Sequence, residues 1–238
     1  PHLLPRNDQP YTPFTGPIEP FINVNAINDV SIQRISGFAQ WSKKSYINEH
    51  RIWYNLGLRA QHWQIDGEGL ESDSHTVVSP RGQFSIKPNW DSDMLFRVSG
   101  GLYYQPPFYR ELRDSIGTVH PEVKAQKSIH IVLGHDYSFA MWDRPFKLVS
   151  EVYYKHLTDV NPFTIDNVKI RYRARNNAVA YAYGIDMNVH GELVKGIESF
   201  FKVGLMRTHE DILNDRYTEY FNAAGERIVF GYSQDQVV

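Results

Sequence analysis

The sequence predicts an all-β fold, in which antiparallel strands form part of a transmembrane β-barrel. Three observations lead to this prediction. Apolar and polar residues alternate with period two over eight stretches, as in strands whose two faces meet different surroundings. These stretches are near the ~9–11 residues that a tilted strand needs to cross a bilayer, whereas a strand of a soluble protein averages about 5–6. The connections between them also alternate between short and long, as in outer-membrane barrels.

Four strands are expected in the first half of the chain, at 32–42, 51–63, 77–87 and 94–105. The first has an apolar face made of Ile35, Gly37, Ala39 and Trp41. The second has one made of Ile52, Tyr54, Leu56, Leu58 and Ala60. The third is the weakest, because Pro80 near its start cannot donate a ladder hydrogen bond. The fourth sets Phe96, Val98 and Leu102 against polar residues such as Arg97.

Four more strands are expected at 127–139, 146–157, 180–191 and 199–208. The fifth strand has an apolar face that includes Ile129, Ile131 and Leu133. The last three follow the same rule, with apolar faces that include Leu148, Val152, Ile185, Met187, Val203 and Leu205. Eight such stretches exceed what scattered hydrophobic residues would give.

The connections sort into two kinds. Short ones are expected at 43–50, 88–93, 140–145 and 192–198, and long ones at 64–76, 106–126, 158–179 and from 209 onward. Outer-membrane barrels keep short turns on the periplasmic side and long loops outside. Residues 1–30, rich in proline, asparagine and aspartate, are expected to be an extracellular loop. The predicted organisation is therefore loop 1–30, strands over 31–208, and a truncated extracellular loop over 209–238.

Composition excludes several classes of function. The chain has no cysteine, so disulfides, thiolate nucleophiles and cysteine-ligated metals are absent. A net charge of −2 gives no reason to expect nucleic acid as a partner. No nucleophile elbow, zinc-protease motif or phosphate loop is present, and His130 and His135 fall on opposite faces of their strand. We therefore expect no enzyme activity, no cofactor and no metal site.

Alternation alone does not decide which face meets water. A soluble, secreted β-sandwich that binds carbohydrate would show the same pattern, and it remains the alternative interpretation. Two features favour the barrel. Aromatic residues cluster near strand ends, where their rings suit a lipid–water boundary, as with Trp41, Tyr54, Tyr137 and Phe146. The polar faces also carry charges in mid-strand, which suit a wet lumen: Arg59, Arg97, Glu151 and Asp186.

Four segments resemble consecutive strands of TonB-dependent outer-membrane receptors. They are Gly101–Leu112, Val123–Phe139, Phe146–Lys155 and Tyr183–Glu192, and they follow one another in the family's order. The last holds a Gly-apolar-acidic core, and the third ends Tyr-Tyr-Lys. The resemblance covers roughly residues 30–215.

The resemblance implies a barrel of about 22 strands in the outer membrane of a Gram-negative bacterium, closed by an N-terminal plug domain. Such a receptor imports a scarce nutrient with energy relayed by TonB. This chain holds no plug domain and no TonB box, and it ends in a polar tail, Ser233–Val238. We therefore expect an internal fragment of about eight strands; a complete eight-stranded barrel is the lesser alternative. The implied partners are outer-membrane lipid and lipopolysaccharide, TonB through a missing N-terminal region, and a surface lipoprotein.

Aromatic and guanidinium groups gather in two long loops and form the candidate ligand site. The first group is Tyr103, Tyr104, Phe108, Tyr109, Arg110 and Arg113, and the second is Arg171 and Arg173. This mixture suits a ligand site, and arginines suit an anionic or polyhydroxylated ligand or lipopolysaccharide phosphates. The alternative is that the arginines form salt bridges with Asp159 and Asp166 within their own loop. The sequence does not name the transported substrate.

Overall fold

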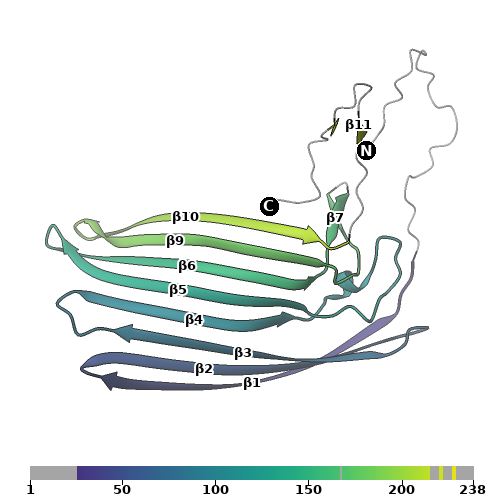
Figure 1. Cartoon of the computed structure of the whole chain (residues 1–238), viewed down its shortest axis with the longest axis horizontal. Coiled ribbons are helices and arrows are strands. Elements are labelled where there is room, and N and C mark those ends of the chain that lie inside the picture. The colour runs from purple at the N-terminus through teal and green to yellow at the C-terminus, as the bar shows by residue number, and fades with distance from the viewer. Residues whose placement is uncertain (1–25, 167, 215–219, 222–226, 229–238) are drawn as a thin grey trace, which may run out of the picture.

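Eight long strands form one antiparallel sheet in the order β1-β2-β3-β4-β5-β6-β9-β10 (Figure 1). The computed structural model describes residues 26–166, 168–214, 220–221 and 227–228. The strands are β1 Val30–Ile47, β2 His50–Gly67, β3 Asp73–Lys87, β4 Asp93–Gln105, β5 Gln126–Met141, β6 Arg144–Val160, β9 Ala178–Val194 and β10 Ile197–Ile212. All eight strands expected from the alternation are thereby confirmed.

Each observed strand is longer than the alternation indicated, with 13 residues in β4 and 18 in β1 and β2. The extra residues lie at strand ends, where the apolar–polar alternation fades but backbone pairing continues. The long connection expected at 64–76 is therefore wrong in length, because β2 and β3 leave only 68–72 between them. The loop expected from 209 likewise begins after Ile212.

Pro80 lies inside β3 without breaking it. It pairs with Leu58 of β2, but the pairing of β3 with β4 begins only at Arg81 and Gly101. Proline lacks a backbone N–H, so it is tolerated where one edge of a strand is unpaired. Pro80 therefore lies where β3 and β4 have already separated.

Three of the four short connections are two-residue turns. Asn48 and Glu49 join β1 to β2 with φ of 45° and 66°, and Trp142 and Asp143 join β5 to β6 with φ of 55° and 56°. Positive φ at both central residues marks the type I′ geometry, whose twist matches that of the flanking strands. Gly196, with φ of 79°, lies in the turn between β9 and β10. These turns hold neighbouring strands in tight register.

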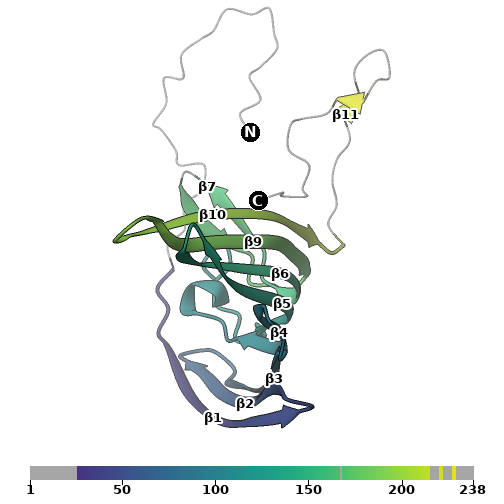
Figure 2. The same cartoon turned by 90° about the vertical axis from the view of Figure 1, so that its left-hand side faces the viewer.

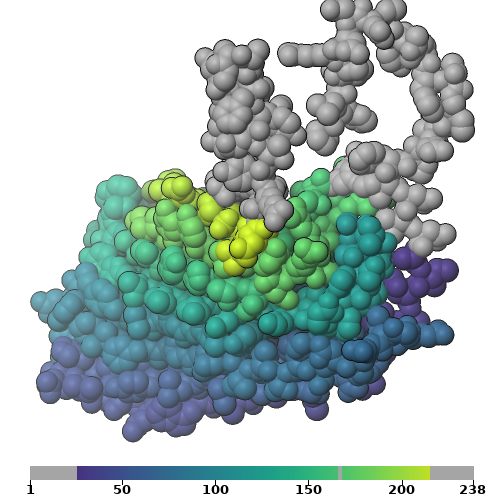
Figure 3. All heavy atoms as spheres, turned by 45° about the vertical axis from the view of Figure 1, so that its right-hand side comes forward, coloured from purple at the N-terminus to yellow at the C-terminus, as the bar shows by residue number. Residues whose placement is uncertain are grey.

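The sheet is strongly curved, and within the described residues it is open (Figure 2). Its edges are β1 and β10, each paired with one neighbour only, β2 and β9 respectively. The heavy atoms of the strands form one continuous surface whose colour changes in chain order from β1 to β10 (Figure 3). The structure is thus all-β, with one large, curved antiparallel sheet.

Smaller elements lie at the end of the sheet opposite the short turns (Figure 1). They are the 3₁₀ helix η1 Tyr109–Leu112, the hairpin of β7 Phe163–Asp166 with β8 Lys169–Tyr172, and the pair β11 Tyr220–Phe221 with β12 Arg227–Ile228. Residues 26–29 have no regular structure, as expected for the first loop; residues 1–25 lie outside the described part. No helix in that part has the length and apolar character needed to cross a membrane.

The two faces of the sheet differ in chemistry. The η1 segment lies within the curve of the sheet (Figure 2) and packs against Trp63, so Trp63 marks the concave face. Residues in register across neighbouring strands share a face, which places an apolar row on the convex face: Ile35, Leu56, Leu58, Val98, Ile131, Leu133, Val152, Ile185, Met187, Val203 and Leu205. These side chains are exposed, from 38% for Ile185 to 70% for Ile35.

Aromatic rings line the convex face near the short turns. His135 stacks on Phe96, with ring centroids 4.9 Å apart, and a chain of ring contacts continues through Tyr137 and Phe139 to Phe146. Trp142 completes it at the β5–β6 turn, 6.4 Å from Phe146. The sheet therefore has a band of aromatic rings beside its exposed aliphatic belt.

Candidate ligand site in the long connections

The connection between β4 and β5, residues 106–125, is packed against the concave face of the sheet. Its Leu112, Val119 and Val123 are buried against Trp63 and Ile65 of β2, which are 1% and 0% exposed. Ala125 and Ala174 complete this core. Trp63 and Ile65 interrupt the polar face of β2, so the position of these two apolar residues marks where the loop packs.

Two asparagines tie this connection to the next one, residues 161–177. Asn161 is 3% exposed; its Nδ2 donates to the Glu111 carbonyl at 2.7 Å, and its Oδ1 accepts from the Arg175 N–H at 3.2 Å. The Asn176 Oδ1 accepts from the Lys124 N–H at 2.7 Å, while its Nδ2 donates to the Asp159 carbonyl at 2.7 Å. The Asn161 bond to Glu111 is buried, so breaking it would leave a polar group unpaired, and it helps to hold the two irregular segments together.

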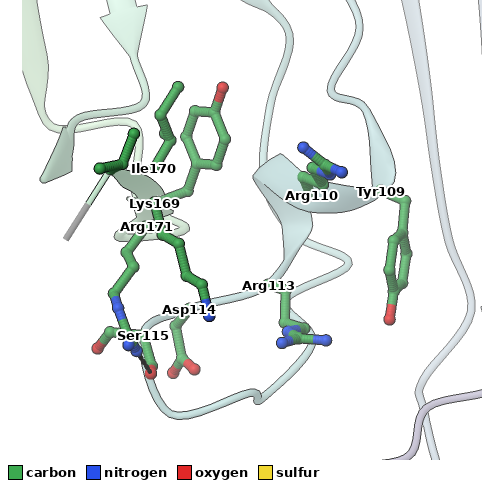
Figure 4. Close-up of a pocket in the computed structure, with 10 residues that line it drawn as sticks. Tyr109, Arg110, Arg113, Asp114, Ser115, Lys169, Ile170 and Arg171 are labelled. Atoms are coloured by element: carbon green, nitrogen blue, oxygen red, sulfur yellow. Dashed lines mark hydrogen bonds between the residues drawn. The ribbon is translucent and has the colours of Figure 1, made fainter. Parts of the chain in front are cut away.

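A pocket of about 810 Å³ opens between η1, the segment after it, and the β7–β8 hairpin (Figure 4). Four of the eight predicted site residues line it: Tyr109, Arg110, Arg113 and Arg171. The structure adds residues that the sequence interpretation missed: Asp114, Ser115, Val168, Lys169, Ile170 and Tyr172. Two loops that are more than 50 residues apart in sequence therefore build one site.

Lys169 is the most informative of the missed residues. It lies two positions before Arg171 in β8, and alternate residues of a strand point to the same side. Period two within the run Lys169–Arg175 would have placed Lys169 beside Arg171. Asp114 and Ser115 follow Arg113 directly but carried no separate signal.

The other four predicted residues lie outside the pocket. Tyr103 stacks on His130 on the concave face, with centroids 4.5 Å apart, and Tyr104 packs against the buried core. The ring of Phe108 lies 5.5 Å from the Arg34 guanidinium, which also donates to the Pro107 carbonyl. Arg173 donates its backbone N–H to the Pro162 carbonyl at 2.9 Å.

Positive charge dominates the pocket. Arg110, Arg113, Lys169 and Arg171 supply four cations, and Asp114 is the one carboxylate among the described lining side chains. The Asp114 Oδ1 accepts from the N–H groups of Ile116 and Thr118 at 3.0 and 2.9 Å. Its Oδ2 lies 3.2 Å from His120 Nε2. The hydrogen bonds of the Asp114 carboxylate are thus made within its own loop.

His120 bridges two carboxylates beside the pocket. Its Nδ1 lies 2.9 Å from Glu122 Oε1 and its Nε2 lies 3.2 Å from Asp114 Oδ2. Partial burial acts to lower the pKa of His120, but its hydrogen bonds to Glu122 and Asp114 outweigh burial and raise it. Partial burial also acts to raise the pKa of Asp114, but hydrogen bonds from His120, Thr118 and Ile116 lower it. The pair therefore favours its charged form.

The intraloop salt bridges considered for the arginines are not seen at Asp159. Of the ion pairs among described residues, none joins Asp159 to an arginine. The Asp166 side chain lies outside the described part of the chain. Arg171 Nη1 instead donates to the Ser115 carbonyl at 3.5 Å, which links β8 to the η1 segment (Figure 4).

A second polar cluster lies on the concave face near the middle of the sheet. Arg97 Nη2 donates to Asp136 at 2.8 Å and to Glu151 at 3.2 Å, and Lys147 Nζ lies 2.8 Å from Asp136. These residues come from β4, β5 and β6. Their charges largely balance, so this cluster joins strands and offers little net charge to a ligand.

No model of a known protein family matches this chain, and no curated protein matches its sequence.

Proposed function

We propose that this chain is part of a TonB-dependent outer-membrane transporter and supplies about eight strands of a plugged barrel that imports a scarce nutrient. The observation that carries the proposal is the contrast between the two faces of the sheet. The convex face exposes an aliphatic belt that includes Ile131, Leu133 and Leu205, which are 52%, 52% and 68% exposed. The concave face holds the ion pairs of Arg97.

The exposed belt calls for an apolar environment. Monomeric soluble proteins rarely expose continuous apolar patches larger than a few hundred Å², and this belt has members on seven of the eight long strands, all except β3. Lipid would cover it without a protein partner, as in outer-membrane barrels, whose apolar face points outward. The aromatic rings that run from Phe96 to Phe146 would then lie at one membrane interface.

The open edges fit a larger barrel. β1 and β10 each have one neighbour among the described strands, and exposed strand edges that carry free N–H and C=O groups are not stable in lipid. Further strands would pair with these edges and close the wall. The long connections would then lie on the external side, together with the pocket.

Strand length also favours this proposal over the soluble β-sandwich. The eight strands have 13 to 18 residues, well above the average of about 5–6 in soluble proteins. A sandwich would also need a second sheet packed on the belt. The other sheets among the described residues are two-stranded hairpins.

The test is the location and behaviour of the whole natural gene product. We expect it in the outer-membrane fraction, soluble in mild detergent, and migrating differently on electrophoresis before and after heating, as folded barrels do. Depletion of TonB should abolish uptake of the nutrient that it imports. Recovery as a water-soluble monomer would overturn the proposal and make the carbohydrate-binding sandwich the leading account.

A further inference from the structure

We infer that the pocket between η1 and β8 binds a phosphorylated ligand through Arg110, Arg113, Lys169 and Arg171. The inference names a ligand chemistry for the site, and it rests on the proposed function only for the pocket's position on the external side. Three features of the pocket support it: the number of cations, the hydrogen bonds that already engage the single described carboxylate, and the contacts that hold the two loops together.

The cations come from two independent elements. Arg110 lies in η1 and Arg113 directly after it, whereas Lys169 and Arg171 lie in β8. All four line the same pocket, and Figure 4 shows their side chains spread around its opening. A ligand bound there would be held from two sides, which a surface arginine cluster on one element does not offer.

Three of the four cations have little internal compensation, whereas Arg171 is already engaged with the Ser115 carbonyl. The Asp114 carboxylate is satisfied by two backbone N–H groups and His120. Arg110, Arg113 and Lys169 take part in no ion pair with a described carboxylate. Arg110 and Lys169 are exposed. An anion entering the pocket would therefore meet the exposed side chains of Arg110 and Lys169, which are free to turn toward it.

Phosphate suits this arrangement better than a single carboxylate. A phosphate monoester carries about −1.5 to −2 charges at neutral pH and three acceptor oxygens, so it accepts forked bonds from more than one guanidinium. Arginine recognises phosphate in this bidentate way, and lysine adds a point charge. Four cations around one pocket suit a doubly charged group, whereas one carboxylate would neutralise less of their charge.

The site is also held in place before any ligand arrives. Asn161 joins the two connections in their buried interior, and Arg171 bonds to the Ser115 carbonyl across the pocket. Loops that are already ordered lose less conformational entropy on binding. The pocket is therefore built to bind without large rearrangement.

Two sources could supply the phosphate: a soluble phosphorylated solute, or the phosphates of lipid A in the surrounding leaflet. The experiment uses the whole natural protein in detergent, freed of lipopolysaccharide. One arm titrates inorganic pyrophosphate by calorimetry. The other adds phosphatidylcholine vesicles that contain lipid A, with vesicles of dephosphorylated lipid A for comparison. Binding of pyrophosphate indicates a soluble ligand, and binding of phosphorylated lipid A alone indicates the lipid source.

The variants are Arg110→Gln and Lys169→Gln, since both side chains are exposed and form no described hydrogen bond that holds the loops. Each should weaken binding roughly tenfold and reduce its dependence on salt, because each removes one cation from the site. Lys124→Gln is the matched control: an exposed lysine of the same connection that does not line the pocket. It should leave binding unchanged.

The inference is overturned if neither probe binds, or if Lys124→Gln weakens binding as much as the pocket variants do. Its failure is separable from that of the proposed function. A protein that fractionates with the outer membrane but binds no phosphate keeps the transporter proposal and loses this one. A soluble protein that binds pyrophosphate through Arg110 and Lys169 keeps the phosphate inference and loses the transporter proposal.

Discussion

The guanidinium of Arg97 on β4 lies 2.8 Å from the carboxylate of Asp136 on β5. The same guanidinium reaches Glu151 on β6 at 3.2 Å, so one side chain joins three strands on the concave face. The Asp136 side chain is only 12% exposed. Removal of Arg97 would leave Asp136 with Lys147 as its remaining ion-pair partner, and it would remove the ion pair of Glu151.

We predict that Arg97→Met lowers the free energy of unfolding by about 1–2 kcal/mol, between the value of an exposed pair and that of a buried one. Urea titration of the folded protein in detergent would measure it. Arg59→Met is the control, because Arg59 is an exposed arginine of β2 that forms no ion pair with a described residue. Equal losses in the two variants would show that the cluster contributes nothing specific.

The membrane proposal predicts unequal losses of stability at two adjacent residues. Ile131 is on the convex face and 52% exposed, whereas Val132 is on the concave face. Ile131→Arg should cost about 2–4 kcal/mol in a lipid bilayer, the cost of a cation at mid-depth on the lipid side of a barrel. Val132→Arg should cost much less, because its side chain would meet the polar interior. Equal free energies of folding into lipid vesicles for the two variants would contradict the assignment of Ile131 to the lipid-facing side.

Gly184 on β9 is expected to tolerate no side chain. A Cβ at this position would lie 2.5 Å from the Leu205 carbonyl oxygen and 2.6 Å from the Tyr153 hydroxyl. Gly184→Ala should therefore lower stability by about 1–3 kcal/mol through overpacking. Gly37→Ala is the matched control on β1, where no atom lies within 4 Å of the added Cβ. Thermal unfolding in detergent should separate the two, and a neutral Gly184→Ala would argue against the β9–β10 register.

The loop beside the pocket should respond to pH through His120. The folded pKa of His120 is raised above its ordinary value of 6.5. Its contribution to the stability of the folded loop is therefore complete below pH 6.5 and is lost as the pH rises through the folded pKa. The pKa of Asp114 is lowered below its ordinary value of 3.8. Its contribution to the stability of the loop is therefore complete above pH 3.8 and is lost as the pH falls through the folded pKa. The loop is therefore held most firmly between these two ordinary values.

Hydrogen exchange of the 106–125 amides, corrected for intrinsic rates, would check this at about pH 5.5 and about pH 8.5. We expect faster exchange at the higher pH in the natural protein and no such change in His120→Gln. His62→Gln is the control, since His62 lies 2.9 Å from the Thr76 hydroxyl and away from this loop. Persistence of the pH effect in His120→Gln would assign it to another group.

The strands were predictable because period-two alternation is local. Ile129, Ile131 and Leu133 mark a face by themselves, whatever surrounds the strand. The ends were less predictable, since pairing continues past the alternating core, as at Ile212. The β7–β8 hairpin was missed because its four-residue strands are too short to show a period.

Four of the ten residues that line the candidate site could be named from sequence, because arginine and tyrosine in long loops suit ligands. The sequence did not separate Tyr109, which lines the pocket, from Tyr104, which packs against the core. That difference depends on how residues 106–125 fold against Trp63 and Ile65. No local pattern in the loop encodes that contact.

The sequence by itself determined that this protein is built from long antiparallel strands with one apolar and one polar face, since side-chain alternation follows from strand geometry alone. Only the tertiary structure decided that the sheet curves, that its apolar face is convex and exposed, and that Arg110 and Arg113 meet Lys169 and Arg171 in one pocket. Curvature and loop packing arise from contacts between residues far apart in the chain, such as Asn161 with Glu111. Such contacts depend on the whole fold.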